Sequence, residues 1–484
     1  MAIIGAGFSG IGMAIKLLEA GREDFVILER ADDVGGTWRA NTYPGCQCDV
    51  PSNLYSFSFA PNPDWSHTFP LQAEIWDYLR RVADDHGLRP RIRFDTDVTG
   101  ASWDETEGLW RIETSTGPLS ADVLVAAMGG LSEPSVPDLP GIESFEGAAF
   151  HTARWDHERE TAGRSVAVVG TGASAIQAIP HLQRDAARLT VFQRTPAWVF
   201  PHPGRGVRAR ERSLFRRLPP IQRAIRTVVH WGREVFLLPF RLRAFRWIPK
   251  RIASQHLARQ VADPVLRARL TPDFEVGCKR ILLSNDYYPA LQQPNVELVT
   301  EAVVEVRPKG VVTADGREHA VDTIVWGTGF TASQLPIGER LRGREGRLLG
   351  DLWRERGMTA LRGTTFAGFP NLFMLVGPNT GLGHTSIILM IESQIAYVID
   401  ALRAMDERGL ASVEPRPEAQ AAFNERLQAS MKGSVWTDGG CSSWYLDPHG
   451  ANRVIWPGTT WGFRQATSRF DPAEYQSSPQ TSSP

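Results

Sequence analysis

Apolar and polar residues at the start of the chain follow a strand, helix, strand order. "MAII" (1–4) is a short apolar run, and a glycine turn separates it from the amphipathic stretch "FSGIGMAIKLLEAG" (8–21). "DFVILER" (24–30) is a second apolar run. Short apolar runs bounded by glycine indicate buried strands, and the longer periodic stretch indicates a helix. The pattern therefore predicts a βαβ unit.

The same pattern returns later in the chain. "RSVAVVGTGASAIQAIPHL" (164–182) predicts a strand, a glycine turn and a helix, and "RLTVFQR" (188–194) predicts the next strand. Two further apolar strands that run into glycine turns, 121–130 and 321–330, bracket this second unit. We therefore expect an α/β fold with two Rossmann-like dinucleotide-binding domains, one inserted into the other.

These patterns divide the chain into five predicted regions, the third of which contains a helical insertion at about 205–270. The regions are the first part of the outer domain, a linker, the inner domain, the second part of the outer domain and a disordered tail: 1–140, 141–156, 157–324, 325–472 and 473–484.

Composition limits the classes of function. The chain is 42% hydrophobic and 22% charged, which is typical of a soluble globular protein. Its net charge of −1 gives no reason to expect nucleic acid as a partner. No uncharged run is long enough to span a membrane and no secretory leader is present, so we expect a cytoplasmic monomer or weak homodimer.

The helical insertion is strongly basic, unlike the chain as a whole. It has 17 Lys and Arg against 3 Asp and Glu between 205 and 269. Such a segment could contact a membrane surface or an anionic substrate. We favour the simpler interpretation, a solvated helical insertion whose charge is offset elsewhere.

The first glycine turn has the spacing G-x-G-x-x-G, through Gly5, Gly7 and Gly10. Glycines between a strand and a helix let a pyrophosphate approach the amides of the helix N-terminus. Glu29 follows at the end of the next predicted strand, where a carboxylate accepts hydrogen bonds from ribose hydroxyls and repels a 2′-phosphate. This unit is predicted to bind an unphosphorylated dinucleotide.

The second turn has the variant G-x-G-x-x-A, through Gly170, Gly172 and Ala175. Arg194 occupies the position that corresponds to Glu29, and a guanidinium there suits the 2′-phosphate of NADPH, with Thr195 as a further donor. Arg194 could instead be a surface cation at the end of a strand. Two dinucleotide sites together predict a flavoprotein that NADPH reduces.

The acceptor of the electrons is either a dithiol or oxygen. Cys46 and Cys48 are separated by one residue, which is tight spacing for a redox pair beside a flavin, so we interpret them as small turn residues. Two cysteines do not form a zinc site, and no metal is expected.

Two longer motifs are more specific. "GGTWRANTYPGCQCD" (35–49) fits the pattern G-G-x-W-x4-Y-P-G-x3-D, and "FEGAAFHTARWD" (145–156) fits F-x-G-x3-H-x3-W-[P/D]. Over nearly its whole length the chain resembles type I Baeyer–Villiger monooxygenases of the flavin-containing monooxygenase superfamily. The second motif is matched by Phe145, Gly147, His151, Trp155 and Asp156.

The resemblance implies roles for individual residues. Arg280 would be the active-site arginine and Asp49 the carboxylate that orients it. Lys279 would join Arg194 and Thr195 on the 2′-phosphate, and Trp444 would contact the nicotinamide nucleotide. The FAD side would include Gly36, Thr37, Trp38, Asp49 and Tyr55. His151 would brace the junction of the two domains rather than transfer protons.

The reaction implied is the conversion of a ketone into an ester or lactone, with NADPH and O2 consumed, through a C4a-peroxyflavin. An enzyme that oxygenates nitrogen or sulfur, or an NADPH-dependent flavin reductase, is the alternative. Family members usually have more residues before the first glycine strand, whereas only four precede Gly5, so we hypothesise a late assignment of the start codon.

Overall fold

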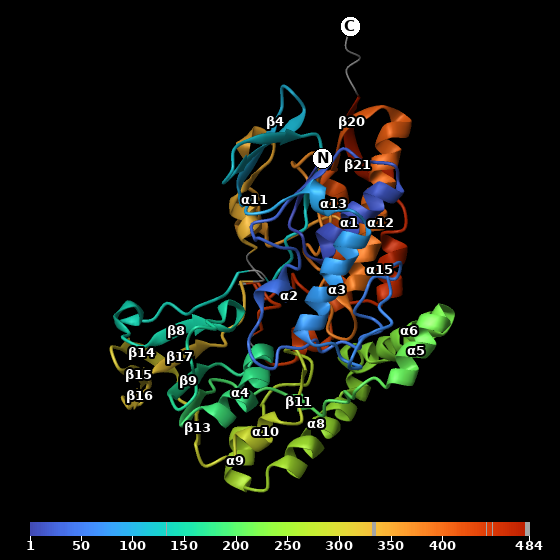
Figure 1. The fold of residues 1–484 in the computed structure, drawn as a ribbon. Coiled ribbons are helices and arrows are strands. Elements are labelled where there is room, and N and C mark those ends of the chain that lie inside the picture. The colour runs from blue at the N-terminus through green and yellow to red at the C-terminus, as the bar shows by residue number, and fades with distance from the viewer. Residues whose placement is uncertain (132, 332–334, 442, 448, 480–484) are drawn as a thin grey trace.

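A computed structural model describes residues 1–131, 133–331, 335–441, 443–447 and 449–479. Two parallel sheets lie in separate lobes, and a group of helices from the insertion packs beneath both (Figure 1). None of the described helices is long and apolar enough to cross a membrane.

The first sheet has five parallel strands in the order β19-β7-β1-β2-β3. Their bounds are β1 Ala2–Ile4, β2 Val26–Leu28, β3 Ile92–Arg93, β7 Leu124–Ala126 and β19 Leu372–Met374. The helices α1 (Phe8–Glu19), α3 (Gln72–Asp85) and α12 (Ile387–Arg408) pack together and bury the apolar faces that the sequence pattern indicates. The central strand β1 is completely apolar and buried, as a strand covered on both faces must be.

The second sheet repeats this plan in the order β8-β17-β9-β10-β13, also with every pair parallel. Its strands are β8 Ala148–His151, β9 Ser165–Val169, β10 Arg188–Phe192, β13 Val296–Val299 and β17 Thr323–Trp326. The helix α4 (Ala173–Asp185) follows β9 as α1 follows β1. The α/β fold with two Rossmann-like units is confirmed.

Each unit also carries a small antiparallel sheet just before its fourth parallel strand. In the first unit the sheet contains β4 Val98–Asp104, β5 Leu109–Thr114 and β6 Leu119–Ala121, with β18 Leu341–Arg342 added at its edge. In the second unit it contains β14 Val303–Arg307, β15 Gly310–Thr313 and β16 Glu318–Ala320.

The helical insertion leaves the second unit after β10. It contains α5 Ala209–Arg217, α6 Pro219–Val235, α7 Leu237–Arg241, α8 Trp247–Gln260 and α9 Pro264–Arg269. The paired strands β11 (Val199–Phe200) and β12 (Leu282–Leu283) mark where the chain leaves and returns, followed by α10 (Tyr287–Ala290). The returning strand delivers the segment around residue 280 to the space between the lobes.

The last third of the chain completes the first lobe. Its remaining elements are α11 Leu349–Arg356, β20 Leu410–Pro415, α13 Pro417–Met431, α14 Val435–Asp438, α15 Thr460–Ala466 and β21 Tyr475–Pro479. β21 pairs antiparallel with β20, and the side chain of Tyr475 is buried. The predicted disordered tail is therefore wrong for 473–479, and 480–484 lie outside the described residues.

Two predicted boundaries also need correction. β8 lies within the segment predicted as a linker, yet it is an edge strand of the second sheet. The apolar strand near 321–330 does not return to the first sheet, because β17 lies between β8 and β9. β7 and β17 are equivalent fourth strands of two repeated units, and the chain rejoins the first sheet only at β19.

Candidate active site

The first glycine turn connects β1 to α1. Gly5 has a φ of +99°, a conformation that favours glycine. A Cβ atom on Gly10 would lie 1.9 Å from the carbonyl oxygen of Gly5, so the helix can approach the turn only because this side chain is missing. Gly7 is the residue before α1 and lines the central cavity. The amides at the N-terminus of α1 are therefore open to an anionic ligand.

Glu29 follows β2 directly and is 6% exposed. Its carboxylate accepts hydrogen bonds from the backbone N–H of Ala6 (2.7 Å) and of Ala31 (2.9 Å). These two bonds hold the carboxylate beside the glycine turn, and an ionised carboxylate has further lone pairs that remain for ribose hydroxyls. Glu29 also lines the cavity.

The segment predicted to contact the flavin begins at the short helix α2 (Thr37–Ala40). Gly36 has a φ of +52°, and its Cβ would lie 3.1 Å from the Cα of Gly7, so the segment lies against the first glycine turn. The indole N–H of Trp38 donates to the hydroxyl of Tyr55 over 3.0 Å. All of these residues line the cavity.

The second glycine turn connects β9 to α4. Gly170 has a φ of +109°, and a Cβ there would lie 2.4 Å from the carbonyl oxygen of Gly327. Gly172 precedes α4 and lines the cavity, while Ala175 is completely buried in the helix. The turn presents the N-terminus of α4 to the same cavity as the first turn does.

Three residues predicted to bind the 2′-phosphate meet beside this turn, since Arg194, Thr195 and Lys279 all line the cavity. Burial, with repulsion from Arg194 as the second cause, lowers the pKa of Lys279. In the described part of the chain neither cation forms an ion pair, although Lys279 lies over the ring of Phe274 at 5.1 Å. Two neighbouring cations without an ion-pair partner have the charge that a dianionic phosphate requires.

Arg280 and Asp49 form a bidentate ion pair on the cavity wall. The Arg280 Nε–H donates to Asp49 Oδ2 over 2.7 Å, and Nη2–H donates to Oδ1 over 2.6 Å. Attraction to Asp49 raises the pKa of the guanidinium, so it stays charged at every relevant pH. Burial alone would raise the pKa of Asp49, but the charge and hydrogen bonds of Arg280 outweigh it and lower that pKa.

Arg233, on α6 of the insertion, is a neighbour of this pair that the sequence patterns do not reveal. Its Nη2–H donates to the backbone carbonyl oxygen of Asp49 over 3.3 Å, and its charge also lowers the pKa of the Asp49 carboxyl. Asp49 therefore lies between two arginines. Only the folded position of α6 brings Arg233 here, and no spacing in the sequence signals it.

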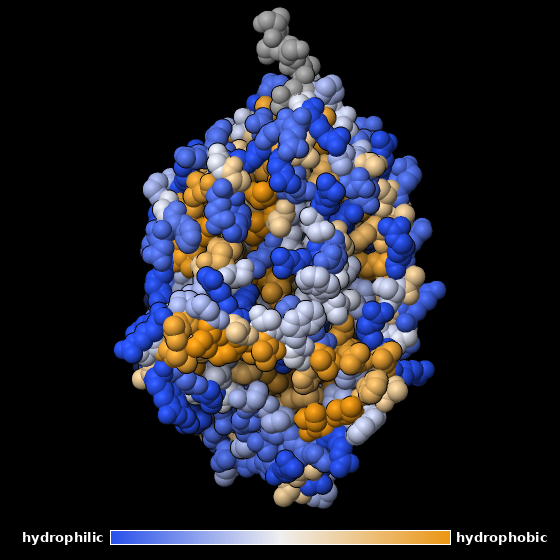
Figure 2. Space-filling model, turned by 90° about the vertical axis from the view of Figure 1, so that its right-hand side faces the viewer, coloured by the Kyte–Doolittle hydropathy of each residue, from blue (hydrophilic) through white to orange (hydrophobic). Residues whose placement is uncertain are grey.

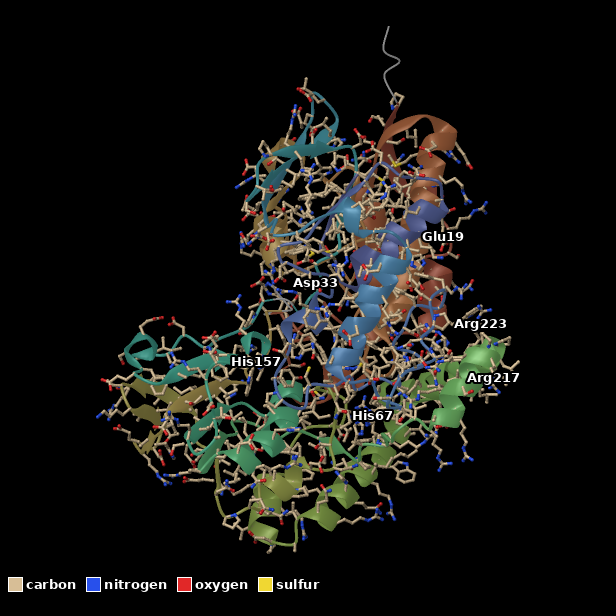
Figure 3. The ribbon with its side chains drawn as sticks, viewed as in Figure 1. Glu19, Asp33, His67, His157, Arg217 and Arg223 are labelled. Atoms are coloured by element: carbon tan, nitrogen blue, oxygen red, sulfur yellow. A yellow bond between two sulfur atoms is a disulfide. The ribbon has the colours of Figure 1, made fainter. Side chains whose placement is uncertain are left out.

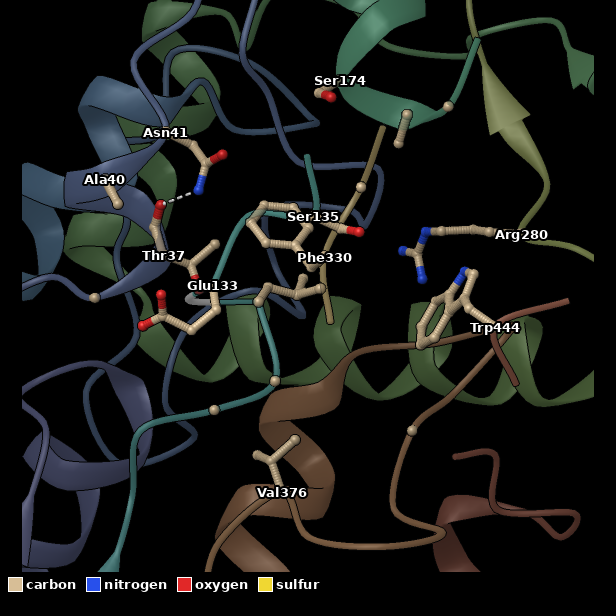
Figure 4. Close-up of a pocket in the computed structure, with 18 of the residues that line it drawn as sticks. Thr37, Ala40, Asn41, Glu133, Ser135, Ser174, Arg280, Phe330, Val376 and Trp444 are labelled. Carbon is tan, nitrogen blue, oxygen red and sulfur yellow. Dashed lines mark hydrogen bonds between the residues drawn. The ribbon is translucent and has the colours of Figure 1, made fainter. Parts of the chain in front are cut away.

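Trp444 and Arg280 both line the cavity, and Figure 4 shows the indole and the guanidinium side by side. The Trp444 side chain is 43% exposed and packs against Tyr445, with ring centroids 4.5 Å apart. A disulfide between Cys278 and Cys441 ties the segment before Lys279 and Arg280 to the segment before Trp444. This pairing was not predicted from the sequence.

Cys46 and Cys48 are free thiols. Burial raises the pKa of Cys46 to about 12 and that of Cys48 well above its usual value. Because the thiolate is the reactive form, this environment is unsuited to a redox dithiol. The interpretation of both as small residues of a turn agrees with this geometry.

The second motif lies outside the cavity. His151 is 3% exposed, burial lowers its pKa to about 4, and its ring packs edge-on against Phe330, with centroids 5.7 Å apart. Trp155 packs edge-on against Phe150 in the same way. The other three residues of the motif also make contacts within the fold. Phe145 packs against an apolar core, and Gly147 leaves room for the carbonyl oxygen of Asp322. The Asp156 carboxylate accepts a hydrogen bond from the backbone N–H of Glu158.

The central cavity has a volume of about 1130 Å³ and is lined from both lobes. Both glycine turns, the Arg280–Asp49 pair and Trp444 lie on its walls. The loop "GPNTGLGHTS" (377–386) contributes further wall residues before α12 begins. An acid at the first turn and two unpaired cations at the second fit an unphosphorylated and a 2′-phosphorylated dinucleotide respectively.

Known proteins resemble this chain over nearly all of its length. A family model described as "Pyridine nucleotide-disulphide oxidoreductase" matches residues 2–219. A Streptomyces coelicolor protein named "Baeyer-Villiger monooxygenase" is 52% identical over 98% of this chain and 92% of its own length. A Pseudomonas aeruginosa protein of the same name is 48% identical over 98% of this chain and 90% of its own length.

Solved structures agree with these relatives. Cyclohexanone monooxygenase from Rhodococcus sp. Phi1, bound to NADP+, superimposes with a TM-score of 0.88 at 30% identity, over 99% of this chain and 98% of that one. A complex of OTEMO with FAD and NADP also has a TM-score of 0.88, at 28% identity over 99% of both chains. On identity and coverage alike, the chain belongs to the Baeyer–Villiger monooxygenase family of flavoprotein monooxygenases.

Proposed function

We propose that the protein binds FAD and NADPH and uses O2 to convert ketones into esters or lactones. The observation that carries this proposal is the Arg280–Asp49 pair, placed on the wall of the cavity that both glycine turns share. When bound, FAD reduced by NADPH supplies the activation of oxygen. The chain's own residues bind the cofactors, exclude water and hold charge.

The first turn suits FAD and the second suits NADPH. Glu29 accepts from ribose hydroxyls at the first turn, and Trp38 and Tyr55 shape the wall next to it. At the second turn Arg194 and Lys279 hold the 2′-phosphate. Solved relatives contain FAD and NADP together, which supports this assignment.

Arg280 stabilises negative charge as it develops on the reacting oxygen atoms. Its bond to Asp49 uses Nε–H and one Nη2–H, so three of the five guanidinium protons remain for other acceptors. An arginine cannot release its proton to the anion it faces, which is the requirement for attack on a carbonyl by an anionic oxidant. A preorganised donor of this kind contributes about 2.7–4 kcal/mol to the transition state.

The test compares Arg280→Ala with the control Arg307→Ala, which removes an exposed arginine of β14 from a pair with Glu305 and Glu318. With ¹⁸O2 and a panel of ketones, we expect Arg280→Ala to lower ester formation by a factor of about 10²–10³. NADPH oxidation persists and releases hydrogen peroxide. Ketone oxygenation that survives the change within tenfold contradicts the role of Arg280.

The alternatives predict different products. An enzyme that oxygenates sulfur or nitrogen keeps its activity in Arg280→Ala, because that reaction does not need an anionic oxidant. A flavin reductase places no ¹⁸O in any organic product. Mass spectrometry of the products therefore separates all three functions in one experiment.

A further inference from the structure

The helical insertion presents an apolar surface to solvent. Twelve of the nineteen exposed large apolar side chains in the described part of the chain lie between Leu214 and Ile252. Figure 2 shows such side chains gathered in a band across the lower half of the face that carries α5 and α6. We name the exposed apolar surface of the insertion the insertion face and define it by Val228, Trp231, Val235, Leu238, Trp247 and Ile252.

The helix α6 is amphipathic, but its apolar side faces solvent and its polar side faces the protein. Val228, Trp231 and Val235 share one side of the helix and are 72%, 50% and 60% exposed. The residues of α6 that are buried are polar, Gln222 and Glu234. A helix of a globular protein normally buries its apolar side, so the outward direction of this one indicates an apolar partner.

The polar side of α6 is fixed to the rest of the molecule. Gln222 donates to the carbonyl oxygen of Asn62 over 2.7 Å, and Glu234 accepts from the backbone N–H of Thr460 over 3.1 Å. These buried hydrogen bonds set the rotation of the helix. The apolar side therefore cannot turn inward without breaking them.

Positive charge surrounds the apolar residues. Of the three acids between 205 and 269, Glu211 pairs with Arg205, Glu234 is buried, and Asp263 caps α9. Several arginines form no ion pair within the described residues, and Figure 3 shows two of them, Arg217 and Arg223, at the outer end of the insertion. These unpaired arginines include Arg210, Arg212, Arg217, Arg223, Arg243 and Arg251.

We propose that the insertion face docks the protein on the surface of an anionic phospholipid membrane. Exposed tryptophan, leucine, valine and isoleucine flanked by arginine are the side chains that insert at the boundary between head groups and acyl chains. Unpaired arginines add attraction to anionic lipid. The inference rests on this surface and is independent of the reaction.

A second copy of the chain fits less well. In a two-fold dimer the same patch faces itself, so the unpaired arginines of both copies would meet. Such a contact removes apolar surface from water but brings like charges together. An anionic membrane offers an apolar interior to the apolar side chains and negative charge to the arginines of the insertion face.

The test uses the full-length, FAD-loaded protein in sedimentation with vesicles. Vesicles of phosphatidylcholine with about one third phosphatidylglycerol should bind the protein at least tenfold more tightly than pure phosphatidylcholine. High salt should weaken this binding. No preference for anionic vesicles would overturn the proposal.

Two variants on the insertion face and two matched controls localise the contact. Trp231→Ser with Trp247→Ser should lower vesicle binding by about tenfold or more, whereas Val136→Ser with Val304→Ser, which are exposed apolar residues elsewhere on the surface, should not. A charge variant should lower binding roughly a hundredfold, at about fivefold for each arginine, while its control does not. The charge variant is Arg217→Gln, Arg223→Gln and Arg243→Gln, and its control is Arg81→Gln, Arg408→Gln and Arg426→Gln.

FAD content and the thermal midpoint should be unchanged in each variant, since all of these side chains are exposed. If the variants on the insertion face bind vesicles as tightly as the parent protein, the docking surface is elsewhere. If the protein instead forms dimers that these variants dissociate and ignores vesicles, the face serves self-association and the proposal is wrong.

Discussion

The two lobes place equivalent elements at equivalent positions and differ in what those elements carry. Read from the same edge, β19-β7-β1-β2-β3 corresponds to β8-β17-β9-β10-β13, and an antiparallel sheet precedes the fourth strand in both. Beyond the second strand the first lobe has Glu29 and the second has Arg194, but the strand register matches Glu29 with Gln193 and sets Arg194 one residue further along. One backbone plan is therefore used twice, and the two lobes carry opposite charges just beyond its second strand.

At two equivalent positions the lobes carry glycine and alanine in opposite order. The last position of the glycine turn is Gly10 in the first lobe and Ala175 in the second. The residue after the fourth strand is Ala127 in the first and Gly327 in the second. In the second lobe a Cβ on Gly327 would lie 2.9 Å from that of Ala175, so this glycine leaves the room that the alanine fills.

The largest effect should come from making the first turn like the second. In Gly10→Ala the new methyl group lies 1.9 Å from the carbonyl oxygen of Gly5, against backbone that cannot move away. We expect a loss of about 3 kcal/mol in the free energy of unfolding, and little retained FAD. Absorbance at the flavin band and urea unfolding measure both, with Ala175→Gly as the mild counterpart. Equal FAD content in the two variants would break the comparison.

The next effect should come from the cations of the second lobe. Replacing Arg194 and Lys279 together by alanine removes the charges assigned to the 2′-phosphate. We expect the KM for NADPH to rise roughly a hundredfold, because hydrogen bonds to charged groups contribute about 1.5–3 kcal/mol each and the two share one phosphate. The KM for NADH, which lacks this phosphate, should change little. A parallel rise for both coenzymes would contradict the assignment.

A smaller effect should come from the contact between Gly327 and Ala175 in the second lobe. Gly327→Ala places two methyl groups in contact at 2.9 Å and should cost about 1–2 kcal/mol in the free energy of unfolding. Adding Ala175→Gly to the same chain should recover most of this loss. A double-mutant cycle by urea unfolding measures the coupling, and strictly additive losses would show that the two positions are independent.

The smallest effect should appear in the pH dependence of coenzyme binding. Burial, and then repulsion from Arg194, lower the pKa of Lys279, so this lysine loses its proton at a lower pH than an exposed lysine does. Protonated Lys279 binds phosphate, and neutral Lys279 does not. The KM for NADPH should therefore rise by several fold as the pH increases through this pKa, while FAD content stays constant. Arg194→Ala removes the second cause and should move the rise to higher pH.

Local patterns predicted the two βαβ units well, because each apolar run pairs with its neighbour in sequence. The glycines and Glu29 lie where those patterns place them. Arg194 lines the cavity as expected, but it lies one residue beyond the position equivalent to Glu29, because the second unit has one residue fewer between its glycine turn and the end of its second strand. The contact between Asp49 and Arg280 was expected from the family resemblance, since no local rule joins residues so far apart in the chain.

Features that depend on long-range packing were missed. Arg233 reaches Asp49 only because α6 folds against the first lobe, and Cys278 reaches Cys441 across 163 residues. The polar composition of the C-terminal segment suggested disorder, but pairing with β20 makes Tyr475–Pro479 a strand. The exposure of the apolar side of α6 was also not predicted, because periodicity shows which residues share one side of a helix and not whether that side faces the core or solvent.

The position of β8 beside β17 has a practical consequence. These are the first and last strands of the second sheet in chain order, and they run in parallel register from Thr323 opposite Ala148 to Trp326 opposite His151. The two connections between the lobes also run side by side, because Ser135 donates to Gly329 and Thr331 donates to Glu133 through their backbones. The second lobe can therefore be replaced by that of a relative through two short junctions, which would exchange the second glycine turn, Arg194 and Lys279 together.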